Sequence, residues 1–383
     1  MDFELGDEQR ELRDTARAWV DKEVIPYAAE WDRAEAVDTA IVGKLGDMGF
    51  LGIEIPEEYG GSGGTALDYC LLLEELGRGD SSVRGIVSVS LGLVGKSIKT
   101  YGTEAQKREW LPRICSGESI GCFGLTEPET GSDAGNLTAK AVQDGDDWLL
   151  SGTKMFITNG TWADIAIIFA RSGGPGPKGV TAFLVPTDAP GFTRTEIKGK
   201  LGLRGQATAE FVLDRVRVPD SARLGELGQG FKIAMGALDK GRMGVAAGCV
   251  GVARGCLEAA VKYAQEREQF GKPIASYQLV QELIADIAVD VEAARLLTWR
   301  VADLVERGKP FGTEASVAKL FASEAAVKAT NNAIQVFGGY GYIDEYPVSK
   351  YLRDARVLTL YEGTSQIQKL LIGRALTGVN AFL

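Results

Sequence analysis

Hydrophobic residues recur at helical spacing in the first third of the chain. Leu12, Ala16 and Val20 lie four positions apart, and this spacing predicts an amphipathic helix with one buried face. Asp7 precedes the run and is the expected cap of this helix. Three more helical stretches are predicted at residues 66–76, 85–101 and 104–114, the last with a Thr-x-x-Gln capping box at its start. Residues 1–120 are therefore expected to form an all-helical domain.

The period of the pattern changes to two near residue 121. Short apolar runs alternate with Gly, Pro and Asp turns up to about residue 220, a pattern typical of β-strands with tight connections. Because no helical run of useful length interrupts them, the strands are expected to pair mostly antiparallel, as a sandwich or barrel. The clearest strands are predicted at residues 149–158, 163–170, 179–185 and 211–218. This gives a central β-domain over residues 121–226.

From about residue 227 the helical period returns and persists. Long helices are predicted over 231–267, 277–307 and 313–337, and a short apolar helix follows residue 363. Ser276 is the expected cap of the second helix, and Gly338 ends the third. The first carries five glycines between 241 and 255, each costing about 1 kcal/mol relative to alanine, which indicates close packing against a helix or a ligand. Residues 227–383 are thus predicted to be a four-helix bundle, in a fold that is α+β and mostly α.

Composition and charge narrow the possible roles. A chain of 383 residues can bury the cores of two or three domains. Its net charge of −10 disfavours binding to the nucleic-acid backbone and to anionic membranes. The first residues are acidic where a secretory signal needs basic ones, and no apolar run of bilayer length is evident. We expect a soluble cytoplasmic protein with no membrane insertion and no nucleic-acid partner.

Cysteine and histidine usage restricts the chemistry. The five cysteines form no Cys-x-x-Cys pair, which is typical of buried thiols in a reducing compartment. The chain has no histidine. A Ser-His-Asp triad, a Cys-His pair and a histidine-ligated metal are therefore excluded, and no metal is expected. Proton transfer has to use a carboxylate, Lys, Tyr, Cys or a cofactor.

Glu362 is the carboxylate that we favour for such a transfer. It lies on a predicted turn between the apolar run 357–361 and the last apolar helix. Partial burial there would raise the pKa of the carboxyl group toward the range of a general base. The alternative is a plain helix start, where a negative charge interacts favourably with the helix dipole. A second stretch, Phe123 to Asp133, favours the catalytic interpretation.

The order of these features resembles the acyl-CoA dehydrogenase family. A helical block precedes a β-domain that opens with Leu125-Thr126-Glu127-Pro128, and Tyr361-Glu362-Gly363 lies near the end of the bundle. The resemblance runs from about residue 5 to the last residue. It implies bound FAD and α,β-desaturation of an acyl thioester, with Glu362 taking the α-proton while hydride passes from the β-carbon to flavin N5. One subset of the family carries its base near an Asp-Lys-x-Arg stretch, where this chain has Gly241.

The resemblance assigns two segments to the flavin of the same subunit. Thr126 is expected to donate to the pyrimidine edge, and an alternating strand places Phe156, over the isoalloxazine, on one face with Thr158, near N5. A packed aromatic in a strand is otherwise core, and Pro128 with Gly131 also fits an ordinary β-turn. The complete set is Phe123, Leu125, Thr126, Gly131, Ser132, Phe156, Ile157 and Thr158, of which Ser132 is also assigned to the substrate.

Further FAD contacts are implied to come from a neighbouring subunit. The turn 266–272 resembles the segment that reaches the adenine and pyrophosphate, where Arg267 supplies a charge-assisted contact. The residues assigned to the neighbour's FAD are Arg267, Gln269, Phe270, Gln278, Gln335, Val336, Gly338 and Gly339, whereas Thr364 and Gln366 are assigned to the subunit that carries Glu362. A shared site implies a dimer, and in this family a homotetramer built from two dimers.

The substrate side is assigned to residues near the base. Asp239 and Arg242 resemble a pair at the mouth of the pocket, although a surface ion pair has the same sequence pattern. Tyr361 and Gly363 flank Glu362 and, like Asp239 and Arg242, are assigned to the substrate.

Arg84 bears on the identity of the acyl group. It falls in the helix expected to floor the acyl pocket, where an arginine would bind a distal carboxylate bidentately. Glutaryl-CoA dehydrogenases carry an arginine in this context, but their companion acidic and serine positions are Gly77 and Gly85 here, which puts decarboxylation in doubt. The alternative is a charged side chain that points to solvent.

The sequence therefore predicts a FAD-dependent acyl-CoA dehydrogenase that acts on a dicarboxylyl-CoA such as glutaryl- or adipyl-CoA. Electron-transferring flavoprotein is the expected acceptor. The enzymatic alternatives are a short- or medium-chain monocarboxylyl-CoA dehydrogenase, an enzyme for acyl groups on a carrier protein, and an acyl-CoA oxidase. A non-enzymatic flavoprotein scaffold is the alternative from another class.

Overall fold

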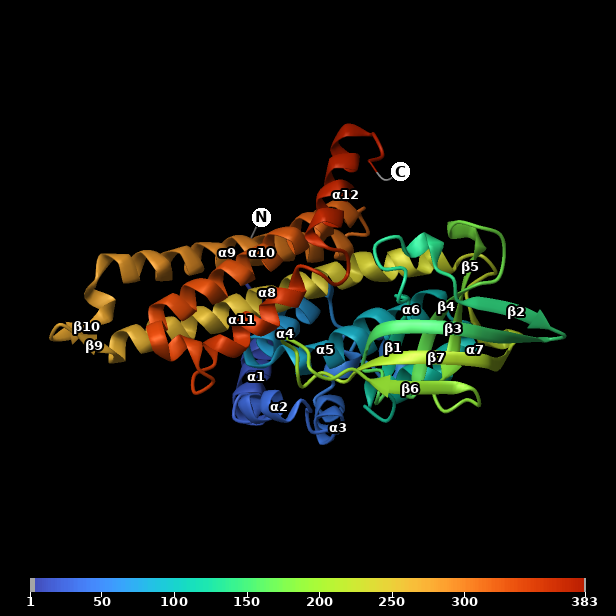
Figure 1. Ribbon diagram of the computed structural model, residues 1–383, viewed down its shortest axis with the longest axis horizontal. Helices are drawn as coiled ribbons and strands as arrows, with labels where there is room; N and C mark the ends of the chain where they lie inside the picture. Colours follow the sequence, from blue (N-terminus) through green and yellow to red (C-terminus); the bar gives the residue numbers. More distant parts are fainter. Residues whose placement is uncertain (1–3, 382–383) are drawn as a thin grey trace.

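Three regions follow one another along the long axis of the molecule. The computed structural model describes residues 4–381 and is shown in Figure 1. The β-domain lies at one end, the ends of the long C-terminal helices lie at the other, and the N-terminal helices pack between them. The longest helix contacts both of the other regions.

Helices make up the N-terminal region, as predicted. They are α1 (Asp7–Glu23), α2 (Ala28–Ala34), α3 (Ala40–Asp47), α4 (Ala66–Gly79), α5 (Ser81–Val89), α6 (Lys96–Tyr101) and α7 (Glu104–Cys115). The cap of α1 is Gly6, because Asp7 is already its first helical residue. The capping box of α7 is confirmed, since Thr103 and Gln106 exchange hydrogen bonds of 3.0 and 3.2 Å. A π-helical turn over Ser90–Gly95 joins α5 to α6, where one continuous helix was expected.

Eight strands form the central domain. They are β1 (Gly121–Gly124), β2 (Lys140–Asp144), β3 (Asp147–Thr158), β4 (Ile165–Arg171), β5 (Val180–Pro186), β6 (Phe192–Glu196), β7 (Thr208–Pro219) and β8 (Arg223–Leu224). Their order is β6-β7-β3-β2-β4-β5-β8, with β1 beside β4. The predicted antiparallel pairing is confirmed except at β4, which pairs in parallel with β1 and, through Lys140 and Arg171 alone, with β2. This single pair joins two antiparallel halves.

The C-terminal region is a bundle with one projecting helix. Its helices are α8 (Gly230–Glu266), α9 (Gln278–Glu306), α10 (Gly312–Phe337), α11 (Val348–Leu358) and α12 (Ser365–Thr377), and a small hairpin of β9 (Glu268–Gln269) and β10 (Lys272–Pro273) links α8 to α9. The fourth bundle helix is α11, which was not predicted, because α12 stands away from the others (Figure 1). Ser276 does not cap α9: its hydroxyl donates to Pro273 O, and Tyr277 is the residue before the helix.

The glycines of α8 allow helices to touch backbone to backbone. A Cβ placed on Gly251 would lie 2.0 Å from the carbonyl oxygen of Glu74 on α4. A Cβ on Gly248 would lie 2.5 Å from Cδ of Arg84 on α5. Since real Cβ atoms do not approach so closely, the close packing predicted from the glycine content is confirmed.

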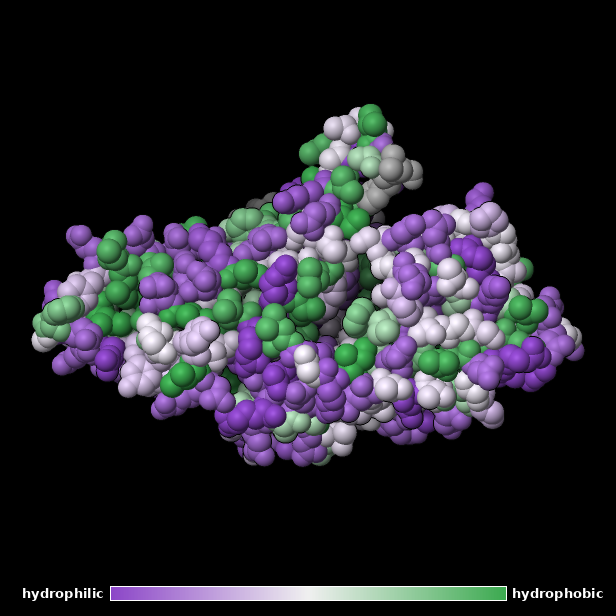
Figure 2. All heavy atoms as spheres, viewed as in Figure 1, coloured by the Kyte–Doolittle hydropathy of each residue, from purple (hydrophilic) through white to green (hydrophobic). Residues whose placement is uncertain are grey.

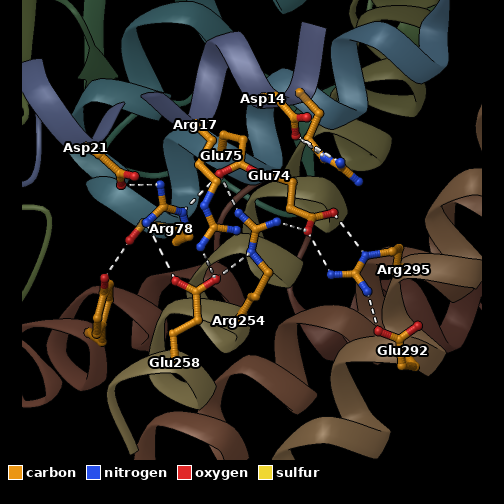
Figure 3. Close-up of polar contacts among 12 residues, drawn as sticks. Asp14, Arg17, Asp21, Glu74, Glu75, Arg78, Arg254, Glu258, Glu292 and Arg295 are labelled. Carbon is orange, nitrogen blue, oxygen red and sulfur yellow. Dashed lines mark hydrogen bonds and ion pairs between the residues drawn. The ribbon is translucent and has the colours of Figure 1, made fainter. Parts of the chain in front are cut away.

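Buried ion pairs lock α4 to its neighbours. Figure 3 shows Glu74 and Glu75 of α4 facing Arg254 of α8 and Arg295 of α9. Glu74 accepts from Arg254 at 2.9 Å and from Arg295 at 2.8 Å, and Glu75, which is fully buried, pairs with Arg78 at 2.9 Å. Because each carboxylate has guanidinium partners, no member leaves an uncompensated charge in the interior.

The cysteines and the most apolar stretch of the chain both lie in the interior. All five cysteines are buried and unpaired, as predicted. The expectation of no apolar run of bilayer length was too strict, because one stretch of α8 is long and apolar enough to cross a membrane. That stretch is 72% buried inside the protein, as in the core helix of a globular fold.

Figure 2 shows that the surface is hollowed between α12 and the β-domain.

Candidate active site

A strained turn between α11 and α12 carries the predicted base. Glu362 has a φ of 50° and Gly363 a φ of 93°, and a glutamate in the left-handed region persists only when its surroundings hold it. Gln368 Nε2 donates to the backbone carbonyl oxygens of Glu362 and Gly363, each at 3.1 Å. Lys319 Nζ donates to Gly363 O at 2.8 Å, and Arg242 Nε to Glu362 O at 3.4 Å. Side chains of three helices therefore fix the turn.

The carboxylate of Glu362 is desolvated on one side. Its Oε2 is buried and has no hydrogen-bond partner among residues 4–381. Burial raises the pKa of Glu362 to about 7, although the positive charges of Arg84, Lys319 and Arg242 oppose the shift. The helix-cap alternative is wrong, because Thr364 caps α12 by accepting from Ile367 N at 3.2 Å.

An apolar wall stands beside this carboxylate. A Cβ on Gly241 would lie 2.2 Å from Glu362 Oε2 and 3.0 Å from Leu93. Leu93 packs with Val89 and Ala237 in a small cluster that Phe123 also contacts. Phe123 thus brings the start of the β-domain to the same wall. Such a wall excludes water from the carboxylate, which agrees with its raised pKa.

Arg84 points into the protein, so the solvent-facing alternative is wrong. It is 2% exposed, and its guanidinium donates to Ser88 Oγ at 3.1 Å and to the Tyr361 hydroxyl at 2.5 Å. Arg84 Nε and the Tyr69 hydroxyl are buried without hydrogen-bond partners among the described residues. A Cβ on Gly244 would lie 3.1 Å from the Tyr69 hydroxyl. Sequence reasoning missed Tyr69, because a tyrosine at helical spacing in an apolar helix carries no signal of its own.

An added side chain at Gly77 or Gly85 would collide with a neighbour. A Cβ on Gly77 would lie 2.5 Å from Gly248 O, and one on Gly85 would lie 1.8 Å from Gln206 Nε2. The clash at Gly77 is with backbone, so no side chain fits there in this packing, whereas a side chain at Gly85 would require the amide of Gln206 to move aside. Arg84 is therefore left without acidic or serine companions at these positions.

The Asp239–Arg242 ion pair is only half exposed. The two side chains lie 2.5 Å apart, and the side chain of Arg242 is 7% exposed while that of Asp239 is 36% exposed. Because Arg242 also reaches Glu362 O, the surface-pair alternative is wrong for the arginine.

The two predicted flavin segments of the β-domain lie side by side. Met155 N donates to Thr126 O at 2.9 Å. Lys154 Nζ donates to Glu127 Oε1 at 2.8 Å and to Leu125 O at 3.2 Å, and both charged side chains are buried. The sequence analysis did not predict this buried ion pair, although a lysine within an apolar strand indicates that a buried partner is needed.

Exposure separates the residues of these segments. Phe156 is 66% exposed, so it is not a core aromatic, and Thr158 is half-buried. A bulge between Lys154 and Ile157 interrupts the strict alternation, and Phe156 has a φ of 61°. Ile157 is buried in the core, so its side chain does not share the exposed face.

The loop that follows Thr126 contains the β-turn expected as the alternative. The backbones of Glu127 and Thr130 exchange hydrogen bonds of 3.0 and 3.2 Å around Pro128. Gly131 and Ser132 come directly after it and are exposed. The turn and an open position for a ligand therefore coexist here.

The residues assigned to a neighbour's cofactor gather at the opposite end of the bundle. A cavity of about 530 Å³ there is lined by Tyr263, Arg267, Gln269, Ile274, Val336, Phe337, Gly338, Gly339, Tyr340 and Ile343. Phe270, Gln278 and Gln335 are nearby in sequence but do not line it. A Cβ on Gly339 would meet nothing within 4 Å, so this backbone is open to a ligand. Figure 1 places the β9–β10 hairpin far from the base of α12.

Known proteins share this architecture. Three family models match the chain: acyl-CoA dehydrogenase N-terminal domain over residues 6–118, middle domain over 122–216 and C-terminal domain over 228–377. The mitochondrial short-chain specific acyl-CoA dehydrogenase of Rattus norvegicus is 44% identical over 96% of this chain and 90% of its own. Two solved structures are also similar in fold and sequence.

One is a chain from work on the electron transferring flavoprotein of Acidaminococcus fermentans. It has a TM-score of 0.97 and 43% identity, and the match covers 98% of this chain and 100% of that one. The other is a glutaryl-CoA dehydrogenase of Mycobacterium smegmatis in complex with FADH2. It has a TM-score of 0.95 and 39% identity over 99% of this chain and 97% of that one.

Proposed function

The chain belongs to the acyl-CoA dehydrogenase family and is a FAD-dependent oxidoreductase acting on acyl-CoA, and on this premise we propose that Glu362 is its catalytic base. The observation that supports the proposal is the buried, unpartnered Oε2 of Glu362 among the described residues, with a carboxyl pKa of about 7. A base that titrates close to neutral pH combines the ionised form with a useful affinity for the proton.

The Glu362–Gly363 turn supplies two groups to the reaction, the carboxylate and the backbone N–H of Glu362. Glu362 Oε2 accepts the proton from the carbon next to the thioester carbonyl. The backbone N–H of Glu362 makes no hydrogen bond within residues 4–381, so it is free to donate to the thioester oxygen, where negative charge develops. FAD, when bound, would supply the acceptor for the hydride of the β-carbon. The wall of Val89 and Leu93 keeps water from the reacting carbons.

The residues at the β-domain fit the isoalloxazine of FAD. Thr126 and the exposed Phe156 are held together by the Met155–Thr126 hydrogen bond. The cavity with Arg267 and Gly339 would hold the adenine and pyrophosphate of a second copy's FAD. The distance between the two sets within one chain supports this dimer (Figure 1), and we extend it to a dimer of dimers.

A dicarboxylyl thioester such as glutaryl- or adipyl-CoA is the substrate that we favour. Arg84 is a buried cation whose guanidinium donates to hydroxyl groups, and its Nε has no partner among the described residues. A distal carboxylate would supply the missing acceptor and the opposite charge. The rival is a short-chain monocarboxylyl-CoA, supported by the short-chain name of the rat relative. In that case the charge of Arg84 would serve Glu362 alone.

One titration separates these substrates. The FAD-loaded protein is titrated without oxygen with butyryl-, octanoyl-, glutaryl- and adipyl-CoA, and loss of the flavin absorbance is followed. Bleaching by the dicarboxylyl esters at much lower concentration supports the proposal, whereas preferential bleaching by butyryl-CoA supports the rival. Glu362→Gln should abolish bleaching by every ester, and a variant that still bleaches at the normal rate would reject Glu362 as the base.

Electron-transferring flavoprotein is the proposed acceptor, which the similarity to the chain from Acidaminococcus fermentans supports. The reduced protein with enoyl product bound should then be stable in air and reoxidise rapidly when the acceptor is added. Rapid reoxidation by oxygen alone would instead indicate an oxidase.

A further inference from the structure

Lys319 is a buried cation without an ion-pair partner in the part of the chain that the structure describes. It lies on α10, is fully buried, and donates from Nζ to Gly363 O at 2.8 Å. An ammonium group in the interior is costly unless it is paired. Its neighbours along the helix, Ala315, Ala318 and Ala322, are buried small residues that would accommodate an apolar side chain. The lysine therefore calls for a role beyond packing.

We propose that Lys319 is a positioning residue for α-proton abstraction, which holds the Gly363 carbonyl and keeps the Glu362 carboxylate ionised between turnovers. The inference rests on the proposed role of Glu362 as the base. It concerns how the charge and orientation of that base are maintained.

Lys319 is well placed to hold the orientation. The Glu362–Gly363 turn has two successive residues with positive φ, and relaxation of such a turn would redirect both the carboxylate and the backbone N–H of Glu362. Gln368 supports the same carbonyl at 3.1 Å, but it is neutral and lies on α12, which follows the turn directly. Lys319 instead ties the turn to α10, a helix that belongs to the packed bundle.

Lys319 is one of three cations whose charges lower the pKa of Glu362. The titratable groups around Glu362 and Lys319 come from five elements and are Tyr69 of α4, Arg84 of α5, Arg242 and Cys249 of α8, Glu324 of α10, and Tyr361 beside the base. Arg242 is already neutralised by Asp239, and Arg84 faces the proposed distal group of the substrate. Lys319 has no such counter-charge among the described residues, so its charge acts on Glu362 together with the larger effect of Arg84.

The direction of the effect follows from the signs of the charges. Lys319 lowers the pKa of Glu362 and so opposes the effect of burial. Burial lowers the pKa of Lys319 itself to about 8, against the opposing effects of Cys249 and Glu362. Loss of the ammonium would therefore leave more of Glu362 protonated and unable to act as a base at neutral pH.

The test compares Lys319→Met with Lys319→Arg in the FAD-loaded protein. The pH dependence of the substrate-driven bleaching rate is measured from about pH 6 to 9.5. We expect the acid limb of the Lys319→Met profile to move up by about one pH unit, with a rate about eightfold lower at pH 6.5 that recovers largely by pH 9. Lys319→Arg should restore most of the normal profile. The control is Lys328→Met on the same helix, whose lysine is exposed and pairs with Asp286 and Asp290, and it should leave the profile unchanged.

A Lys319→Met profile with the normal midpoint would overturn the inference, and so would an equal loss of rate at every pH, because neither result shows that the ammonium group keeps Glu362 ionised. A second measurement remains available if this variant folds poorly. Melting temperatures at pH 8 are measured for Lys319→Gln, Glu362→Gln and the double variant, and coupled shifts are expected because the two groups interact. Additive shifts would contradict the inference. If Glu362→Gln bleaches normally, the proposed base itself fails, whereas an inactive Glu362→Gln with a normal Lys319→Met profile rejects only the role of Lys319.

Discussion

Gly241 on α8 occupies the place where a side chain would collide with the carboxylate of Glu362. A Cβ added at this glycine would lie 2.2 Å from Oε2, so the absence of a side chain at 241 and the inward direction of Glu362 depend on each other. The position that carries the base in one subset of the family thus lies directly against Glu362 in space.

Gly241→Ala should therefore impair catalysis more than it impairs the fold. Alanine stabilises a helix interior by up to about 1 kcal/mol relative to glycine, so a fall in rate reports the displaced carboxylate. We expect a rate of flavin bleaching at least about tenfold lower. The matched control is Gly373→Ala on α12, where a Cβ meets nothing within 4 Å, and this variant should keep the normal rate. Equal rates in the two variants would show that Glu362 can move aside freely.

Glu362→Gln should be more stable than the natural protein above neutral pH. The folded-state pKa of Glu362 is raised from 4.5 to about 7 by burial, so its contribution to stability is fully present below about pH 4.5 and is lost as the pH rises through 7. A rise of about 2.5 units corresponds to about 3 kcal/mol. Urea unfolding at pH 8 and pH 5 checks this, and the gain should be large at pH 8 and small at pH 5. A pH-independent difference would contradict the assigned cause.

Arg84→Ala should change substrate preference, provided that the acyl group carries a distal carboxylate. Charge-assisted hydrogen bonds contribute about 1.5–3 kcal/mol, so kcat/KM for glutaryl-CoA should fall roughly 10- to 150-fold. Removal of a cation near Glu362 also raises the pKa of the base and slows every substrate. The ratio between glutaryl- and butyryl-CoA is therefore the quantity to measure. An unchanged ratio would reject the dicarboxylyl substrate.

Lys154→Met should weaken both the β-domain and its hold on FAD. It would leave Glu127 buried without its cation, and a broken buried pair costs about 3–5 kcal/mol. Glu127 would keep its bonds from Thr138 and Ala139, so the chain should still fold at low temperature. FAD retention during gel filtration and the melting temperature should fall together. Lys140→Met, at an exposed position of β2, is the control, and similar losses in both variants would remove any special role for the pair.

Mixed dimers test whether the site is shared. Glu362→Gln disables the base, and Arg267→Ala weakens the contact to the neighbour's FAD. In a dimer of one variant with the other, one site carries both changes and the second carries neither. Random mixing gives half mixed dimers with one intact site of two, so about a quarter of the sites should regain activity. No recovery would indicate that each chain builds its site alone.

Periodicity in the sequence was enough to predict the three regions, because burial imposes a period of 3.6 on helices and of 2 on strands. Glu362 could be singled out because the absence of histidine left few bases and the flanking residues are apolar. The run at 348–358 does carry helical spacing at Val348, Tyr351, Ala355 and Leu358, but only the fold shows that α11, and not α12, completes the bundle. Lys319 and Tyr69 could not be predicted as site residues, because the groups they lie against, Gly363 and Gly244, are far away in sequence. Ser276 is a residue type that often caps helices, but its hydroxyl donates to the carbonyl oxygen of Pro273 instead of accepting from the first turn of α9.

The cluster of carboxylates and guanidinium groups around Glu74 and Glu75 affects how the molecule responds to heat and salt. Because the penalty for dehydrating ions decreases on warming, this junction of α1, α4, α8 and α9 should weaken less with temperature than the purely apolar contacts beside it. Ions in the solvent screen buried pairs poorly. Concentrated salt should therefore weaken exposed ion pairs, such as that of Arg307 with Asp303, before it weakens this interior junction.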